Sequence, residues 1–258
     1  METTCETEGA TVSLSPEDRA KSDIAYDNIA LSIAEYEDSP EVNAFTSKYD
    51  YSLAKVVKLT RQERKGLALF KGKGKRKKCH ILGRDRPLLT DFTFDNLGIP
   101  QNPENPAGVA PDFVDPGLGG FLQSAGYDED LYEEEWGKQK VPTLRNVDLR
   151  PDAEFVKAFG HNGYFKSLEG IVHFYNTQDV KPECPGPCTE AEALAADCWP
   201  PPEVPETVNE AELGDLRLTP QDEEDLVAFL KTLSDGYTVT GVIKVGPSSS
   251  GARSSVRP

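Results

Sequence analysis

The stretch Leu59–His80, LTRQERKGLALFKGKGKRKKCH, contains a helix start, a helix stop and a pair of side chains that can bind metal. Thr60 and Glu63 have the spacing of a capping box, which predicts a helix over residues 60–71. Three small or apolar residues share one face of this helix: Gly66, Leu67 and Phe70. The basic run GKGKRKK breaks the helix, so the Cys-His pair at its end begins a new segment.

A second strong helix signal lies near the end of the chain, in LRLTPQDEEDLVAFLKTLSDG (residues 216–236). Thr219 can cap it and Pro220 suits its first position. Its apolar stripe consists of Leu226, Phe229, Leu230 and Leu233. Weaker patterns predict further helices over 15–38, 128–136, 153–159 and 167–176, with mainly loop between 81 and 140. The first of these carries an apolar stripe, Ala25, Ile29, Ile33 and Tyr36, that needs a packing partner.

Composition limits the classes of partner. The 258 residues carry a formal net charge of -16, which disfavours nucleic acid because phosphate binding requires clustered Lys and Arg. No apolar run reaches the roughly 18 residues that a membrane span needs. The opening METTCETEGA has neither a basic nor an apolar region, so we expect no signal peptide in this chain and no membrane span.

Cys79-His80 carries the candidate chemistry. A c-type haem needs a thiol that forms a thioether with a vinyl group and an adjacent His that reaches the iron, usually as CxxCH. Here Arg76 occupies the position of the first cysteine, so the motif is half present. Three other cysteines, Cys184, Cys188 and Cys198, share a proline-rich loop, where we expect a disulfide or free thiols rather than a metal site, with the pairing left open.

The two helices and four longer segments carry a family resemblance. The segments are LTRQERKGLALFKGKGK, TDFTFDNLGIPQNPENP, GKQKVPTLRNVDLRPDAEFVKAFGHNGYFKSLEGIVHFYNT and LTPQDEEDLVAFLKTLSDGY. They resemble the C-terminal haem domain of bacterial dihaem cytochrome c peroxidases, most closely the MauG-like branch. The resemblance implies an all-α, class-I-like cytochrome c domain with long irregular loops. It also implies that the first and last helices cross closely at a glycine, flanked by aromatic residues.

The resemblance implies roles for particular residues. His80 matches the proximal haem ligand and Cys79 the thioether cysteine, so the cofactor would be haem c with a single thioether, or haem held noncovalently. Tyr175 matches the distal ligand of the MauG-like branch, and Arg145 would pair with a haem propionate. We expect His161 and His173 to be structural. The family's calcium, bound by main-chain carbonyls, would lie near residues 156–158.

The same comparison implies the organisation of the chain. Residues 1–47 resemble the end of a missing first haem domain, 48–237 the haem domain, and 238–258 a disordered tail. With only one Cys-His pair, the expected function is electron transfer through one haem, in the periplasm and with a redox protein partner. The basic edge Lys71–Lys78 is either a docking site for an acidic redox partner or a solvated loop. The alternatives are a peroxidase that uses a second haem from a partner, and a domain that has lost haem.

Overall fold

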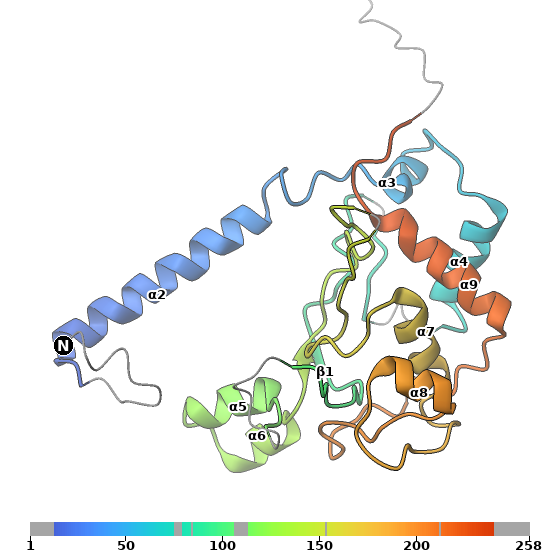
Figure 1. Ribbon diagram of the computed structural model, residues 1–258. Coiled ribbons are helices and arrows are strands. Elements are labelled where there is room, and N and C mark those ends of the chain that lie inside the picture. The colour runs from blue at the N-terminus through green and yellow to red at the C-terminus, as the bar shows by residue number, and fades with distance from the viewer. Residues whose placement is uncertain are drawn as a thin grey trace, which may run out of the picture. The chain divides into compact units, whose positions relative to one another are not determined.

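The computed structural model describes residues 13–74, 79–83, 85–105, 113–152, 154–211 and 213–239 (Figure 1). The chain divides into one unit that ends at Thr46 and a second that begins at Ser47. The first unit contains helix α2, and all other elements belong to the second. Its elements are α3 (Lys48–Leu53), α4 (Arg61–Lys71), β1 (Phe94–Asp95), α5 (Gly117–Ser124), α6 (Glu129–Glu134), β2 (Gln139–Lys140), α7 (Leu168–Thr177), α8 (Glu190–Ala196), α9 (Pro220–Leu230) and η2 (Lys231–Leu233).

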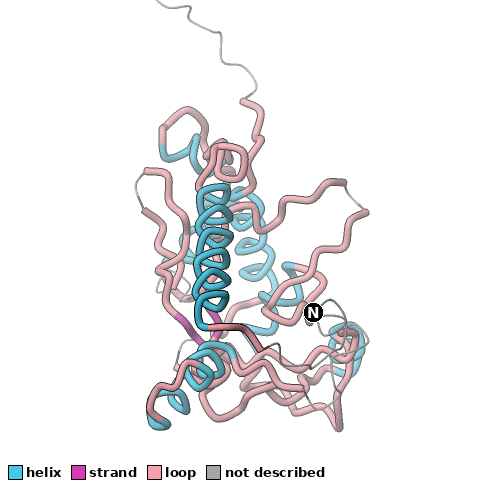
Figure 2. The backbone as a smooth tube through the Cα atoms, turned by 90° about the vertical axis from the view of Figure 1, so that its left-hand side faces the viewer, coloured by secondary structure: helices cyan, strands magenta, loops and turns pink. Residues whose placement is uncertain are grey.

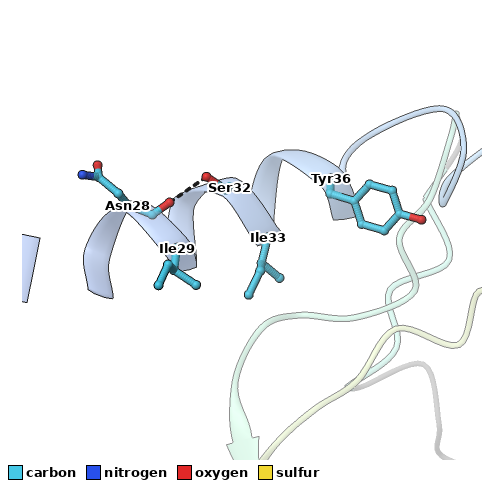
Figure 3. A pocket seen from close by; sticks show the side chains of 5 residues that line it. All are labelled: Asn28, Ile29, Ser32, Ile33 and Tyr36. Atoms are coloured by element: carbon cyan, nitrogen blue, oxygen red, sulfur yellow. Dashed lines mark hydrogen bonds between the residues drawn. The ribbon is translucent and has the colours of Figure 1, made fainter. Parts of the chain in front are cut away.

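Helix α2 (Pro16–Glu37) forms where the sequence predicts it. The Ser15 hydroxyl accepts the Asp18 N–H at 3.1 Å, and Pro16 takes the first helical position. None of its residues is buried. A shallow hollow on its surface is lined by Asn28, Ile29, Ser32, Ile33 and Tyr36 (Figure 3). The apolar stripe of this helix is therefore uncovered within its own unit.

The second unit is built on the crossing of α4 and α9. A Cβ at Gly66 would collide with the main-chain carbonyl of Asp225 and lie 2.8 Å from the Cβ of Phe229. Only a glycine lets the two backbones approach this closely. The predicted helices at 60–71 and 216–236 and their crossing at a glycine are therefore confirmed, with both capping boxes formed.

Aromatic rings fill the space around this crossing. The Phe229 ring packs edge-on against Phe70 at 5.3 Å and against Tyr49 of α3 at 5.4 Å between centroids. Phe70, Leu226 and Phe229 are fully buried. Edge-to-face aromatic pairs contribute about 0.5–1.5 kcal/mol beyond the area that they bury. The crossing thus forms the centre of the hydrophobic core rather than its edge.

Helix α7 packs against α9 and brings a second aromatic cluster into the same core. Phe174 of α7 lies 5.0 Å from Phe165 and 5.2 Å from Trp199 between ring centroids. The only disulfide among the described residues joins Cys184 to Cys198 and holds the loop that contains α8. This pairing settles the choice that the sequence left open for these cysteines, since Cys188 forms no disulfide.

Helices are the main regular structure of the second unit, joined by long loops (Figure 2). In the described part of the chain, the only sheet is the antiparallel pair β1–β2, with Phe94 opposite Lys140. No helix in the described ranges is long and apolar enough to cross a membrane.

The predicted helix at 153–159 is wrong. Phe155 and Val156 are exposed, so the apolar pattern there does not face the core. Main-chain bonds between Phe159 and Phe165, at 2.8 and 3.3 Å, make a bridge instead of a helical turn. Helices α3, α5 and α8 were not predicted. Of the expected disordered tail, residues 240–258 lie outside the described part of the chain.

Candidate functional site

His80 lies in the core, next to the α4–α9 crossing. Its side chain is buried, and its ring centroid is 6.4 Å from that of Phe70. The Nδ1–H donates to the main-chain carbonyl of Leu89 at 2.8 Å. In this tautomer the lone pair is on Nε2, the nitrogen that binds iron in a haem protein.

The loop that supplies this carbonyl is held in an uncommon conformation. Arg86, Leu89 and Phe92 all have positive φ, at 42°, 58° and 63°. For residues with a Cβ, each such conformation costs on the order of 1 kcal/mol. The surrounding structure holds it, because the Thr90 hydroxyl donates to the Val141 carbonyl at 2.7 Å. The loop is therefore fixed in the form that presents the Leu89 carbonyl to His80.

The donors at this position fit a c-type haem. A buried imidazole whose second nitrogen donates to a main-chain carbonyl is the usual arrangement of a His that binds metal. Cys79, the neighbouring thiol, is half-buried and forms no disulfide in the described structure. The substitution of Arg76 for the first cysteine lies outside the described residues, as do Lys75–Lys78 of the basic edge.

Arg145 is buried between two carboxylates. Its guanidinium donates to Asp50 at 2.8 and 3.2 Å and to Asp235 at 2.8 Å. Burial raises the pKa of Asp50, but the hydrogen bonds and charge of Arg145, with bonds from Ser47, outweigh burial and lower it. The structure therefore gives Arg145 a structural role, because it joins Asp50 of α3 to Asp235, which lies two residues after the end of η2. Its contact with a propionate stays a prediction.

Tyr175 lies on α7, half-buried against the core. Its ring is 6.3 Å from that of Phe174, and its carbonyl accepts the Gly214 N–H at 2.8 Å. It shares a helix face with Ile171, four residues earlier, which is also partly buried. Its role as distal ligand stays a prediction.

The other two histidines pair with glutamates. His173 Nδ1 lies 3.0 Å from Glu223 Oε1, and His161 Nε2 lies 2.8 Å from Glu203 Oε2. Burial raises the pKa of Glu203, but the His161 bond, the Asp115 N–H and Asn162 outweigh it and lower the pKa. These contacts agree with the structural roles expected for both rings.

The calcium expected near 156–158 stays a prediction. The Lys157 ammonium donates to the carbonyls of Asn146 and Leu149, at 2.8 and 3.1 Å, and so holds this loop. No group of three or more His, Cys, Asp or Glu side chains in the described ranges could hold a metal ion. Such groups consist of side chains, whereas the expected calcium site consists of main-chain carbonyls.

Sequence analysis missed the residues that support the site. The Leu89 carbonyl has no sequence signal, because a leucine with positive φ cannot be predicted from composition. Asp50 does have one, since Ser47 and Asp50 form a capping box for α3. The partners Asp235 and Glu223 lie in or near a helix that was predicted, but their pairing depends on tertiary contacts.

Comparisons with known proteins agree with this site. No family profile matches the chain. It is 33% identical to the methylamine utilization protein MauG of Paracoccus denitrificans over 225 residues, covering 82% of this chain and 52% of that protein. It is 27% identical to the cytochrome-c peroxidase IdrP2 of a Pseudomonas species over 157 residues, covering 57% of this chain and 41% of that protein.

Solved structures give the same family. The diheme peroxidase BthA of Burkholderia thailandensis superimposes with a TM-score of 0.58 at 30% identity, covering 77% of this chain and 48% of that one. A MauG-like protein associated with microbial copper homeostasis, at 23% identity and a TM-score of 0.51, shares the fold over 74% of this chain and 49% of that one. The chain thus spans about half the length of the curated relatives it matches. By sequence and by fold, it belongs to the MauG-like dihaem cytochrome c peroxidase family.

Proposed function

We propose that residues 48–237 form a class-I-like cytochrome c domain that binds one haem c and transfers electrons through it, with His80 as the proximal ligand. The observation that carries the proposal is the buried imidazole of His80, oriented by the Leu89 carbonyl at 2.8 Å. A haem bound there would supply a one-electron iron couple. Cys79 would form a single thioether, and without that bond the haem would be held noncovalently.

Two further residues complete the proposed site. Tyr175 would close the distal side, because it is a half-buried phenol on a helix packed into the same core. An anionic oxygen ligand stabilises ferric iron and would keep the potential low. Arg145 would either contact a propionate or hold the wall of the site through Asp50 and Asp235.

Peroxide reduction is the second candidate function. It is favoured by the names of the relatives, which include cytochrome-c peroxidases and a diheme peroxidase. The Tyr175 proposal opposes it, because peroxide needs an open position on iron. A partner that carries a second haem would remove this conflict. Peroxide added to the haem-loaded chain should shift its Soret band if this haem reacts with peroxide and leave the band unchanged if the chain only transfers electrons. A peroxidase that depends on a partner's haem would consume peroxide only after that partner is added.

The site of action proposed here is the periplasm. The disulfide Cys184–Cys198 supports it, since disulfides persist in oxidising compartments and are rare in the cytosol. The family is shown by sequence and fold, whereas the compartment, the electron donor and the acceptor belong to the proposal.

The decisive experiment counts haems and tests their attachment. The chain would be expressed with a c-type maturation system and measured by pyridine haemochrome and acid–acetone extraction. We expect one haem that stays with the chain. Cys79→Ser should release the haem on extraction, and His80→Gly should abolish or shift the Soret band.

His161→Gln is the matched control, since it removes a histidine that pairs with Glu203 instead of lying in the core. It should leave the haem content and spectrum unchanged. A folded wild-type chain with no Soret band would reject the proposal and favour the haem-free alternative. A spectrum that survives His80→Gly unaltered would reject the ligand assignment.

A further inference from the structure

Helices α5 and α6 form a hairpin that exposes three of its large apolar side chains. Phe121 on α5, Tyr127 in the turn and Leu131 on α6 are 63%, 52% and 42% exposed. The two helices pack on each other in the second unit, beside β1 (Figure 1). We call Phe121, Tyr127 and Leu131 the hairpin patch. Several large apolar residues exposed on one short hairpin favour an interaction surface more than single exposed side chains do.

The hairpin has a fixed shape. Gly119 of α5 packs so closely on α6 that a Cβ there would lie 2.5 Å from the Tyr132 carbonyl oxygen. Main-chain bonds close both ends, with the Tyr127 N–H on the Leu122 carbonyl at 3.0 Å and the Leu118 N–H on the Lys138 carbonyl at 2.9 Å. The exposure of the patch is therefore a property of a folded element, and a partner would meet a surface that is already formed.

The charge around the patch is strongly of one sign. From Phe113 to Lys138 the sequence has seven Asp and Glu residues and one lysine, a net charge of -6 out of -16 for the whole chain. That lysine pairs with Glu135 at 3.2 Å. No ion pair within the described ranges involves the other exposed carboxylates of α6, Glu129, Asp130, Glu133 and Glu134. Their field therefore extends into solvent around the patch.

This field decides which partner fits. A second copy of the chain would bring another hairpin of net charge -6, and nucleic acid or an anionic lipid surface would also be repelled. A protein whose lysines surround an apolar contact would satisfy both the carboxylates and the patch. Such complementary charge increases association rate and selects the partner, while the buried apolar centre supplies most of the affinity.

We propose that the α5–α6 hairpin is a docking surface for a basic protein partner, with the hairpin patch as its apolar centre and the α6 carboxylates as its rim. The inference does not depend on haem, since every residue in it lies outside the His80 site. It assigns a docking function to an acidic hairpin and a basic partner, whereas the candidate from sequence is the basic edge Lys71–Lys78, which would take an acidic partner.

Calorimetric titration of the full chain with a small, strongly basic c-type cytochrome, which presents lysines around an apolar haem edge, tests the proposal. We expect Phe121→Ser to weaken binding about tenfold, the loss typical of an apolar residue at an interface centre. The double variant Glu133→Gln, Glu134→Gln should weaken binding about fivefold at low salt and make it less sensitive to salt. The matched control is Glu154→Gln, Glu183→Gln, which removes two exposed charges from loops of the second unit outside the hairpin. It should change the affinity less than twofold.

Each other outcome overturns the proposal. If the wild-type chain does not bind the cytochrome, the proposal is rejected. It is also rejected if the hairpin and control double variants weaken binding equally, because the attraction would then be long-range only. Wild-type affinity in Phe121→Ser would show that the patch is not the contact. Sedimentation of the chain alone should show a monomer. Self-association that Phe121→Ser abolishes would show that a second copy of the chain, and not a basic partner, occupies the patch. Unchanged circular dichroism of each variant shows that it is folded.

Discussion

Two helix pairs in this protein meet at a glycine. One pair buries the aromatic rings beside that glycine, and the other exposes two of its aromatic rings. At the α4–α9 crossing, Gly66 faces the Asp225 backbone, and the aromatic rings Phe70 and Phe229 are fully buried around it. In the α5–α6 hairpin, Gly119 faces the Tyr132 and Trp136 backbone, and the aromatic rings Phe121 and Tyr127 are exposed. Close helix contact is thus the same local feature in both pairs.

The difference teaches that a glycine contact fixes the distance between two helices but not the role of the pair. The first pair is enclosed by α3 and α7 and by the loop that carries His80, so it forms the interior of the domain. The second pair contacts β2, and the Trp136 carbonyl just after α6 accepts the Thr207 hydroxyl, but Phe121 and Tyr127 stay exposed. We infer that the first pair exists to build the His80 site and the second to present a surface.

The largest effect should come from the buried ion pairs of Arg145, which join α3 to the segment after η2. Arg145→Met would leave the Asp50 and Asp235 carboxylates without their cation, and breaking such a buried ion pair costs about 3–5 kcal/mol of unfolding free energy. Denaturant unfolding at neutral pH measures this loss. Arg150→Met, which removes a more exposed pair with Asp148, is the control and should cost less than about 1 kcal/mol.

The same variant has a pH signature. Because the pKa of Asp50 is lowered in the folded wild type, its ionic contribution is complete above about pH 4 and is lost as the pH falls through the folded pKa. Arg145→Met has already lost that contribution. The stability gap between variant and wild type should therefore narrow below about pH 4, and a gap that widens in acid would contradict the assignment of Asp50 as the partner.

The next effect tests the glycine of the first pair. Gly66→Ala places a methyl group against the Asp225 carbonyl, so α4 and α9 must separate, and we expect a loss of about 3 kcal/mol. The lower midpoint of denaturant unfolding reports it. Gly186→Ala, where a Cβ would meet nothing within 4 Å, is the matched control and should stay within about 0.5 kcal/mol of wild type. Equal effects of the two variants would remove the basis of the comparison.

The core helices could be predicted from sequence because each local signal agrees with the tertiary structure. Thr60 and Thr219 both cap as expected, and the stripe that contains Leu226 and Phe229 is the buried one. His80 could be proposed as a ligand only from its neighbour Cys79 and from the family resemblance. Its burial and its bond to Leu89 depend on a loop that contains three residues with positive φ. No sequence periodicity predicts such a loop.

Predictions from the sequence were wrong where the apolar side chains of a segment do not pack into the core. Residues 153–159 have a helical pattern of apolar residues, yet Phe155 and Val156 face solvent, and the main chain of Phe159 bonds that of Phe165 instead of forming a helical turn. Helix α5 was missed because three of its eight residues are glycines, which favour loops in any propensity argument. Its stability comes from packing on α6, a tertiary effect.

A smaller and local effect is expected at the second glycine. Gly119→Ala would push α6 away from α5 by contact with the Tyr132 carbonyl and the Trp136 backbone, at a cost of about 1–2 kcal/mol. Because α5 and α6 make few contacts with α4, α7 and α9, this strain should open the hairpin alone. Hydrogen exchange should quicken at the Leu118 and Gly119 amides and stay unchanged in α9. Quickening throughout α9 would show that the two pairs form one cooperative unit.

The smallest effect on stability is expected at Phe121, the most exposed residue of the hairpin patch. Phe121 is 63% exposed and lies at the surface of the hairpin, so Phe121→Ser removes little buried area and should change the unfolding free energy by less than about 0.5 kcal/mol. Phe70→Ser, a change of the same chemistry in the fully buried ring of the first pair, should cost several times more. Thermal unfolding of both variants measures the contrast. A large loss in Phe121→Ser would mean that the ring stabilises the fold, and its exposure could no longer be assigned to a partner.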